Sequence, residues 1–89
     1  MNEVELTKIF KSFGNQNRIK ILRLLKKDKE SPVAEIARKI KLSVKSTSKH
    51  LNILLNVGIL ENEGKNKSVF YKINHDVSEF VTAILKILP

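Results

Sequence analysis

The sequence predicts a mainly α-helical fold with one small β-hairpin. Three observations support this class. Apolar residues recur every three to four positions through most of the chain, the period changes after Gly58, and polar or glycine-containing stretches separate the segments. With 89 residues the chain has the length of one domain, which we expect to span residues 1–89.

The first two helices are expected at 3–13 and 16–27. Apolar residues in the first helix recur at i, i+3, i+4 and i+7, which places them on one helical face. Gly14-Asn15 ends this helix. The second helix has a broader apolar face, and the polar residues 28–30 follow it as a loop.

The third and fourth helices form a close pair, at 32–40 and 44–57. Ser31 is a suitable N-cap for the third helix, and proline is favoured at its first position. A short turn follows, in which Ser43 caps the fourth helix, and a glycine stops that helix. The sequence therefore predicts a helix-turn-helix over about 32–57.

A β-hairpin follows the helix pair, over about 59–73. Its first strand opens directly after the fourth helix, residues 64–67 have turn chemistry, and residues 69–73 form the returning strand. Asn74 then caps a last helix, which we expect at 75–88. Four helices, two strands and a final helix give the order of a winged helix-turn-helix, in which the hairpin is the wing.

The charged residues in the middle of the chain are all of one sign. The formal net charge is +8, and residues 36–60 contain five basic residues and no acidic one. These basic residues are Arg38, Lys39, Lys41, Lys45 and Lys49. A lysine-rich composition explains part of the excess, but a stripe of one sign is the expected electrostatic footprint of nucleic-acid binding. We therefore expect a polyanionic partner.

The fourth helix has the two faces that reading a DNA major groove requires. At about 100° per residue, the inward face is formed by Val44, Thr47, Leu51, Leu54, Leu55 and Gly58. Polar side chains dominate the outward face, and Ser48 and His50 lie on the flanks. We expect base contacts from Lys45, Ser46, Ser48, Lys49 and Asn52. Phosphate contacts are expected from Lys41 and, at the tip of the hairpin, Lys65 and Lys67.

Plainer alternatives fit the same features. The fourth helix also fits an ordinary amphipathic surface helix, and the hairpin lysines fit a solubilising turn. A winged helix of this kind can instead dock an acidic protein, or bind nucleic acid as an architectural module without sequence specificity. RNA is a further alternative, but the single Tyr71 and the absence of tryptophan argue against single-strand recognition by base stacking.

Several segments resemble the ArsR-type winged-helix repressors. Residues 42–51, LSVKSTSKHL, and residues 57–60, VGIL, resemble the recognition-helix motif of that family. Residues 13–15 and 17–22 resemble the opening of its second helix, and residues 71–73 resemble the end of its wing. The resemblance implies a winged-helix dimer that binds operator DNA, often as a repressor. We therefore expect a sequence-specific transcription regulator, a repressor, that reads a pseudo-palindromic duplex site in the major groove.

The chain departs from the family pattern at two places. Residues 16–18 read Gln-Asn-Arg where Pro-Thr-Arg is usual, and Thr47 replaces a usual apolar residue. Lys45 and Lys49 also make the reading face more basic than is common in the family. His50 matches the family motif, and we expect it to be a packed, hydrogen-bonded structural residue.

Helices 3–13 and 75–88 are expected to form a homodimer interface. Together they contain more large apolar side chains than one chain of this length is expected to cover. The interface candidates are Leu6, Ile9, Phe10, Phe13, Phe80, Val81, Ile84, Leu85 and Leu88. The alternative is that both helices pack on their own domain. A two-fold dimer would place two recognition helices about one DNA turn apart, ~34 Å.

Other classes of function find no support in the sequence. The chain has no cysteine, and the potential ligands His75, Asp76 and Glu79 are too few for a Zn²⁺ site, so we expect no metal and no cofactor. No phosphate-binding loop or nucleophile beside a base is present, so we expect no enzyme. The acidic, polar N-terminus and the short apolar runs predict a cytoplasmic protein without a membrane span.

Overall fold

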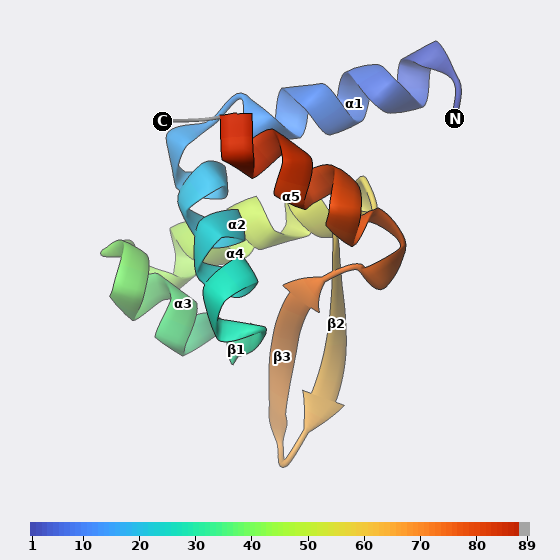
Figure 1. The fold of residues 1–89 in the computed structure, drawn as a ribbon. Helices are drawn as coiled ribbons and strands as arrows, with labels where there is room; N and C mark the ends of the chain where they lie inside the picture. Colours follow the sequence, from blue (N-terminus) through green and yellow to red (C-terminus); the bar gives the residue numbers. More distant parts are fainter. Residues whose placement is uncertain (88–89) are drawn as a thin grey trace.

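The computed structural model describes residues 1–87, which fold as a helical domain with a three-stranded antiparallel sheet (Figure 1). The elements are α1 (Glu3–Phe13), α2 (Gln16–Asp28), β1 (Glu30–Pro32), α3 (Val33–Ile40), α4 (Val44–Asn56), β2 (Leu60–Lys65), β3 (Ser68–Ile73), the 3₁₀ helix η1 (His75–Val77) and α5 (Ser78–Ile87). The hairpin of β2 and β3 extends from one end of the molecule, and α1 and α5 lie at the opposite end (Figure 1). The expected winged helix-turn-helix is confirmed.

Capping side chains fix three of the helix starts. The side chains of Asn2 and Asn15 accept hydrogen bonds from backbone N–H groups of the first turns of α1 and α2. Ser43 caps α4 in the same way, through a 3.0 Å bond from the N–H of Ser46. These bonds satisfy N–H groups that have no partner inside the helix. The expected bounds of these helices are accordingly confirmed to within one residue.

The start of the third helix was predicted wrongly, because a short strand precedes it. Ser31 lies in β1 rather than at a helix cap, and α3 begins one residue after the proline that we expected as its first residue. β1 pairs antiparallel with β3, with Ser31 opposite Tyr71, so the sheet order is β1-β3-β2. The pairing partner lies far along the chain, and a three-residue strand has no periodicity of its own.

The turn of the wing is shorter than the sequence predicted. Residues 66–67 alone form it, since β2 runs through Lys65 and pairs with β3 from Leu60↔Ile73 to Lys65↔Ser68. Asn66 and Lys67 both have positive φ, 48° and 69°, as the tight turn between twisted strands requires. Lys65 therefore lies at the end of a strand, and Lys67 lies at the tip.

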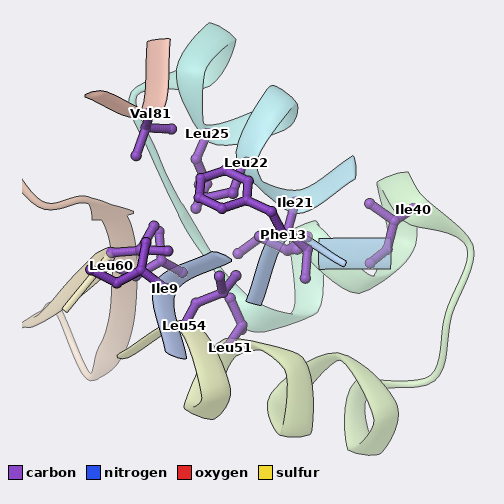
Figure 2. Close-up of a cluster of buried hydrophobic side chains, with 12 residues drawn as sticks. Ile9, Phe13, Ile21, Leu22, Leu25, Ile40, Leu51, Leu54, Leu60 and Val81 are labelled. Atoms are coloured by element: carbon purple, nitrogen blue, oxygen red, sulfur yellow. The ribbon is translucent and has the colours of Figure 1, made fainter. Parts of the chain in front are cut away.

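One hydrophobic core joins the helices to the base of the wing. Side chains from α1, α2, α3, α4, β2 and α5 converge in it (Figure 2). Its fully buried apolar members are Ile21, Leu22, Leu25, Ile36, Leu51, Leu54, Ile59 and Val81. Because α4 contributes two of these residues, the same burial that stabilises the fold fixes the orientation of α4.

The last helix begins with a 3₁₀ turn rather than directly as an α-helix. Asn74 accepts a bond from the N–H of Asp76 and donates a 3.2 Å bond to the carbonyl oxygen of Gly58. Its own N–H donates to the carbonyl oxygen of Ile59 at 2.8 Å. Asn74 thus ties the entry of α5 to the end of α4. Leu88, an expected interface residue, lies outside the described residues.

Candidate nucleic-acid interface

The turn between α3 and α4 holds the two helices in a defined geometry. Lys41 ends α3 in the left-handed conformation, at φ 61° and ψ 45°, and its N–H donates to the carbonyl oxygens of Ala37 and Arg38. The N–H of Leu42 donates to the same Ala37 oxygen at 3.0 Å. Ser43 then caps α4. The whole turn is therefore hydrogen-bonded, and it positions the first turn of α4.

The outward face of α4 is polar and basic, as the sequence predicted. Lys45, Lys49 and Asn52 are exposed, and Ser46 and Ser48 are half-buried beside them. Lys45 and Lys49 lie one turn apart on the same side of the helix. This arrangement presents two cations and short hydrogen-bonding side chains together, which are the groups that base edges and phosphates accept.

The inward face of α4 differs from expectation at its first residue. Thr47, Leu51 and Leu54 are buried, but Val44 is 49% exposed. The core packs against the later turns of the helix, so its first turn projects beyond the apolar cluster. Helical periodicity assigned Val44 to the core side and carried no information on where the core ends.

The hydroxyl group of Thr47 is buried without a hydrogen-bond partner among the described residues. The residue itself is 0% exposed. The carbonyl oxygen of Ser43, one turn earlier, accepts the N–H of Thr47 at 3.0 Å but no bond from its hydroxyl. A buried unpaired hydroxyl costs about 1–3 kcal/mol of stability. The departure from an apolar residue at this position therefore destabilises the domain.

Ion pairs divide the basic stripe into two groups. Arg38 pairs with Glu35, and Lys39 pairs with Asp28 at 2.6 Å. The hydrogen bond from Arg38 lowers the pKa of Glu35 and raises that of Arg38. The second group is Lys41, Lys45 and Lys49, which form no ion pair within residues 1–87. Within this stripe, the cations that no acid pairs in residues 1–87 therefore lie on the turn and on α4.

The two wing lysines also differ from each other. The ammonium group of Lys65 donates to both carboxylate oxygens of Glu30, at 2.8 and 3.0 Å, and this bond raises the pKa of Lys65. The ammonium nitrogen of Lys65 also lies 5.8 Å from the centre of the Phe70 ring. Lys67 is exposed at the tip and pairs with no acid in the described part of the chain. Of the two, Lys67 is the better phosphate candidate.

His50 joins α4 to the preceding helices. Its Nδ1 lies 3.2 Å from Nη1 of Arg18, and Nε of Arg18 donates to the carbonyl oxygen of Ser12 at 2.7 Å. Burial lowers the pKa of His50, and the charge of Arg18 lowers it further. Because a guanidinium group can only donate, Nδ1 of His50 is the acceptor of the bond from Arg18. The predicted structural role of His50 is confirmed.

The candidate dimer residues fall into two groups. Ile9, Phe13 and Val81 are buried in the core of one chain, so the structure removes them from the proposed interface. Periodicity identified their apolar face but not what covers it. Leu6 and Phe10 are 36% and 52% exposed, and Phe80, Ile84 and Leu85 are half-buried. The exposed apolar residues Met1, Val4 and Ile87 add to this end of the molecule, and the sequence analysis did not include them.

The remaining predictions of absence concern metal and membrane. In residues 1–87 no group of three or more histidine, aspartate or glutamate side chains is placed to hold a metal ion. No helix in that range combines the length and the apolar character that crossing a bilayer requires.

The fold and the basic α4 define a winged helix-turn-helix protein. The chain belongs to the arsR family of bacterial regulatory proteins, whose model matches residues 15–62, from α2 into β2. The resemblance that the recognition-helix motif indicated is therefore confirmed. Membership in a family of regulatory proteins agrees with the prediction that the chain is not an enzyme.

Three curated relatives show the range of this family. A homolog of the cadmium resistance transcriptional regulatory protein CadC from Staphylococcus aureus is 31% identical over 84% of this chain and 62% of that protein. The arsenic resistance transcriptional regulator ArsR1 of Pseudomonas putida is 31% identical over 88% of this chain and 61% of its own length. An uncharacterized HTH-type transcriptional regulator of Methanocaldococcus jannaschii is 35% identical over 90% of this chain and 86% of its own length. The chain thus spans about three fifths of the cadmium and arsenic relatives.

Solved structures support the fold. A homodimeric winged helix-turn-helix DNA-binding domain from Mycobacterium bovis matches with a TM-score of 0.86 at 24% identity, covering 93% of this chain and 77% of that one. The transcriptional repressor PagR of Bacillus anthracis matches with a TM-score of 0.81 at 26% identity, covering 96% and 93%.

Proposed function

We propose that this protein is a transcription repressor that binds a pseudo-palindromic site in duplex DNA. In this proposal α4 enters the major groove, and the wing contacts the adjacent backbone. The observation that supports it best is a set of three cations that form no ion pair within residues 1–87, Lys41, Lys45 and Lys49, on the exposed side of the helix-turn-helix. Neighbouring cations on α3 are already neutralised by acids.

The individual contacts follow from the exposure of each side chain. Lys45, Lys49 and Asn52 would reach base edges, since lysine suits guanine acceptors and asparagine suits adenine. Ser46 and Ser48 would add shorter contacts at the groove floor. Lys41 and Lys67 would contact phosphates and position the protein without reading sequence.

We further propose that the protein acts as a homodimer through α1 and α5. Leu6 and Phe10 present exposed apolar surface on α1, and Ile87 does so on α5. An exposed apolar cluster at one end of a small domain is typical of a protein interface. A substitution Phe10→Glu is expected to yield a monomer in light scattering. Val69→Glu, at a similarly exposed valine on the wing, is the matched control and should leave the mass unchanged.

Cadmium and arsenic appear in the names of two relatives, but this chain contains no cysteine to form a thiolate site. We propose that its DNA affinity does not respond to such ions. Titration with Cd²⁺ and with arsenite tests this, and a change of tenfold or more in the dissociation constant would contradict it.

The DNA-binding proposal is tested by selection from a randomised duplex library near physiological salt, with the mass measured in the same buffer. The expected result is an enriched palindrome with half-sites one helical turn apart, and a dimer mass. Retention without an enriched motif would favour the architectural alternative, and no retention would favour an acidic protein partner.

A matched pair of double variants locates the binding surface. Lys45→Gln/Lys49→Gln removes two unpaired charges, and Arg38→Gln/Lys39→Gln removes two paired charges from the adjacent helix. Both variants lose the same formal charge. The proposal predicts that the first abolishes retention of the selected site and that the second retains it. Equal losses would show that total charge, rather than α4, governs binding.

A further inference from the structure

Val44 is one of two exposed apolar residues of α4. The exposed large apolar residues of α1 and α5 lie at the proposed dimer end, whereas α4 exposes only Val44 and Ile53 among its described residues, at 49% and 41%. A single exposed valine is common on protein surfaces. Val44, however, is the first residue of the helix that we propose to enter the major groove.

The backbone around Val44 is held firmly. The preceding Ser43 caps the helix by accepting the N–H of Ser46 at 3.0 Å, and its carbonyl oxygen accepts the N–H of Thr47 at 3.0 Å. A β-branched side chain in a helix has one strongly preferred rotamer. The short side chain of Val44 therefore loses little conformational entropy when it contacts a partner.

Val44 borders both faces of α4: Thr47 and Leu51, at i+3 and i+7, belong to the buried inward face, whereas Ser48, at i+4, is proposed to contact DNA. Helical spacing places Val44, Ser48 and Asn52 in one row at i, i+4 and i+8. Lys45 and Lys49 form the adjacent row. An uncharged row beside a charged row is suited to a groove in which base edges form the floor and phosphates form the walls.

We propose that Val44 contacts the C5-methyl group of a thymine in the major groove and so makes the protein select a T·A pair there. This inference rests on the proposed function. The thymine methyl is the apolar group that base edges present in this groove, and small apolar side chains recognise it. The contact removes apolar surface of both partners from water.

Replacing thymine with uracil tests the contact, because it removes only the methyl group. Each thymidine of one selected half-site is replaced in turn by deoxyuridine, and the dissociation constant is measured. The wild-type protein should lose affinity about fourfold at one position, which is the effect expected for one buried methyl group. At the other positions the substitution should have little effect.

Protein variants assign that loss to Val44. Val44→Ala should bind the thymidine duplex more weakly and should show no further loss with deoxyuridine. Val44→Thr keeps one methyl group and should show a smaller loss than the wild type. Ile53→Ala is the matched control, because Ile53 is similarly exposed but lies about 13 Å farther along the helix axis. It should keep the wild-type response.

Three outcomes would overturn the inference. If deoxyuridine has no effect at any position, no methyl group is read, and the proposed function still stands. If Val44→Ala keeps the full wild-type loss, another residue reads the methyl group. If the library yields no enriched site, the proposed function fails, and the inference fails with it. Thermal unfolding of each variant confirms that the exposed substitution leaves the fold intact.

Discussion

The two faces of α4 differ in what surrounds their side chains. The outward face exposes Lys45 and Lys49, which form no ion pair in residues 1–87, whereas the inward face buries Leu51 and Leu54 completely. Substitutions outward should therefore change DNA binding without changing stability, and substitutions inward should do the reverse. One helix is thus fixed by its packed face while its opposite face remains free to bind.

The two lysines of the wing differ in the same way, since one is held within the fold and the other is free to bind a partner. Lys65 is bonded to Glu30 and belongs to the folded structure, and Lys67 projects from the tip without an acidic partner in the described residues. The sequence alone predicted the same phosphate-contacting role for both lysines.

The largest expected effect is on the outward face. Lys49→Ala should weaken binding to the selected site by about 10–100-fold, as the loss of a base contact does, and should weaken binding to random DNA much less. The paired Arg38 provides the control, since Arg38→Ala should change both affinities little. Equal losses on both duplexes would make Lys49 a phosphate contact.

Substitutions on the inward face of α4 should change the stability of the fold. Thr47→Val removes the unpaired buried hydroxyl and should stabilise the fold by about 1 kcal/mol, which raises Tm by several degrees. The matched control is Thr7→Val, because the hydroxyl of Thr7 is exposed and donates to the carbonyl oxygen of Glu3 at 2.8 Å. Calorimetry of both variants would contradict this account if Thr47→Val unfolds at a lower temperature than the wild type.

Substitutions at the two wing lysines should differ in how they change the salt dependence of DNA binding. Lys67→Gln should reduce the slope of log K against log salt concentration by about one unit, because one phosphate contact is lost. Lys65→Gln should leave the slope unchanged, since its charge is already neutralised by Glu30. An identical change in both variants would remove the distinction between the tip and the strand.

The smallest effect is expected from pH. The folded state lowers the pKa of His50, so the unfolded state binds its proton more readily. Stability from this residue should be fully present above pH 6.5, the ordinary value, and should be lost as the pH falls below it. His50→Gln should remove that part of the decline. Denaturant unfolding between pH 5 and 8 measures it.

Local features of the fold were predictable from sequence. Asn15, Ser43 and Gly58 mark helix ends through hydrogen bonds and φ angles that involve only near neighbours. The outward position of Lys45 and Lys49 follows from helical periodicity alone. These parts of the candidate site could therefore be placed without a structure.

Features that depend on distant residues were not predictable. β1 exists because it pairs with β3, and the bond between Lys65 and Glu30 joins two separate strands. Likewise, periodicity placed Phe13 on the apolar face of its helix, but it did not show that this face packs against the same chain. In each case the deciding partner lies too far along the chain for a local pattern to reveal.

DNA reading by α4 is tested most directly by an amide chemical-shift map of the isotope-labelled protein titrated with its selected duplex. We expect the largest changes at residues 41–52 and at the wing tip, 66–68, with smaller changes along α3. Changes confined to α3, or to the end of the molecule that contains α1 and α5, would contradict the claim that α4 reads DNA.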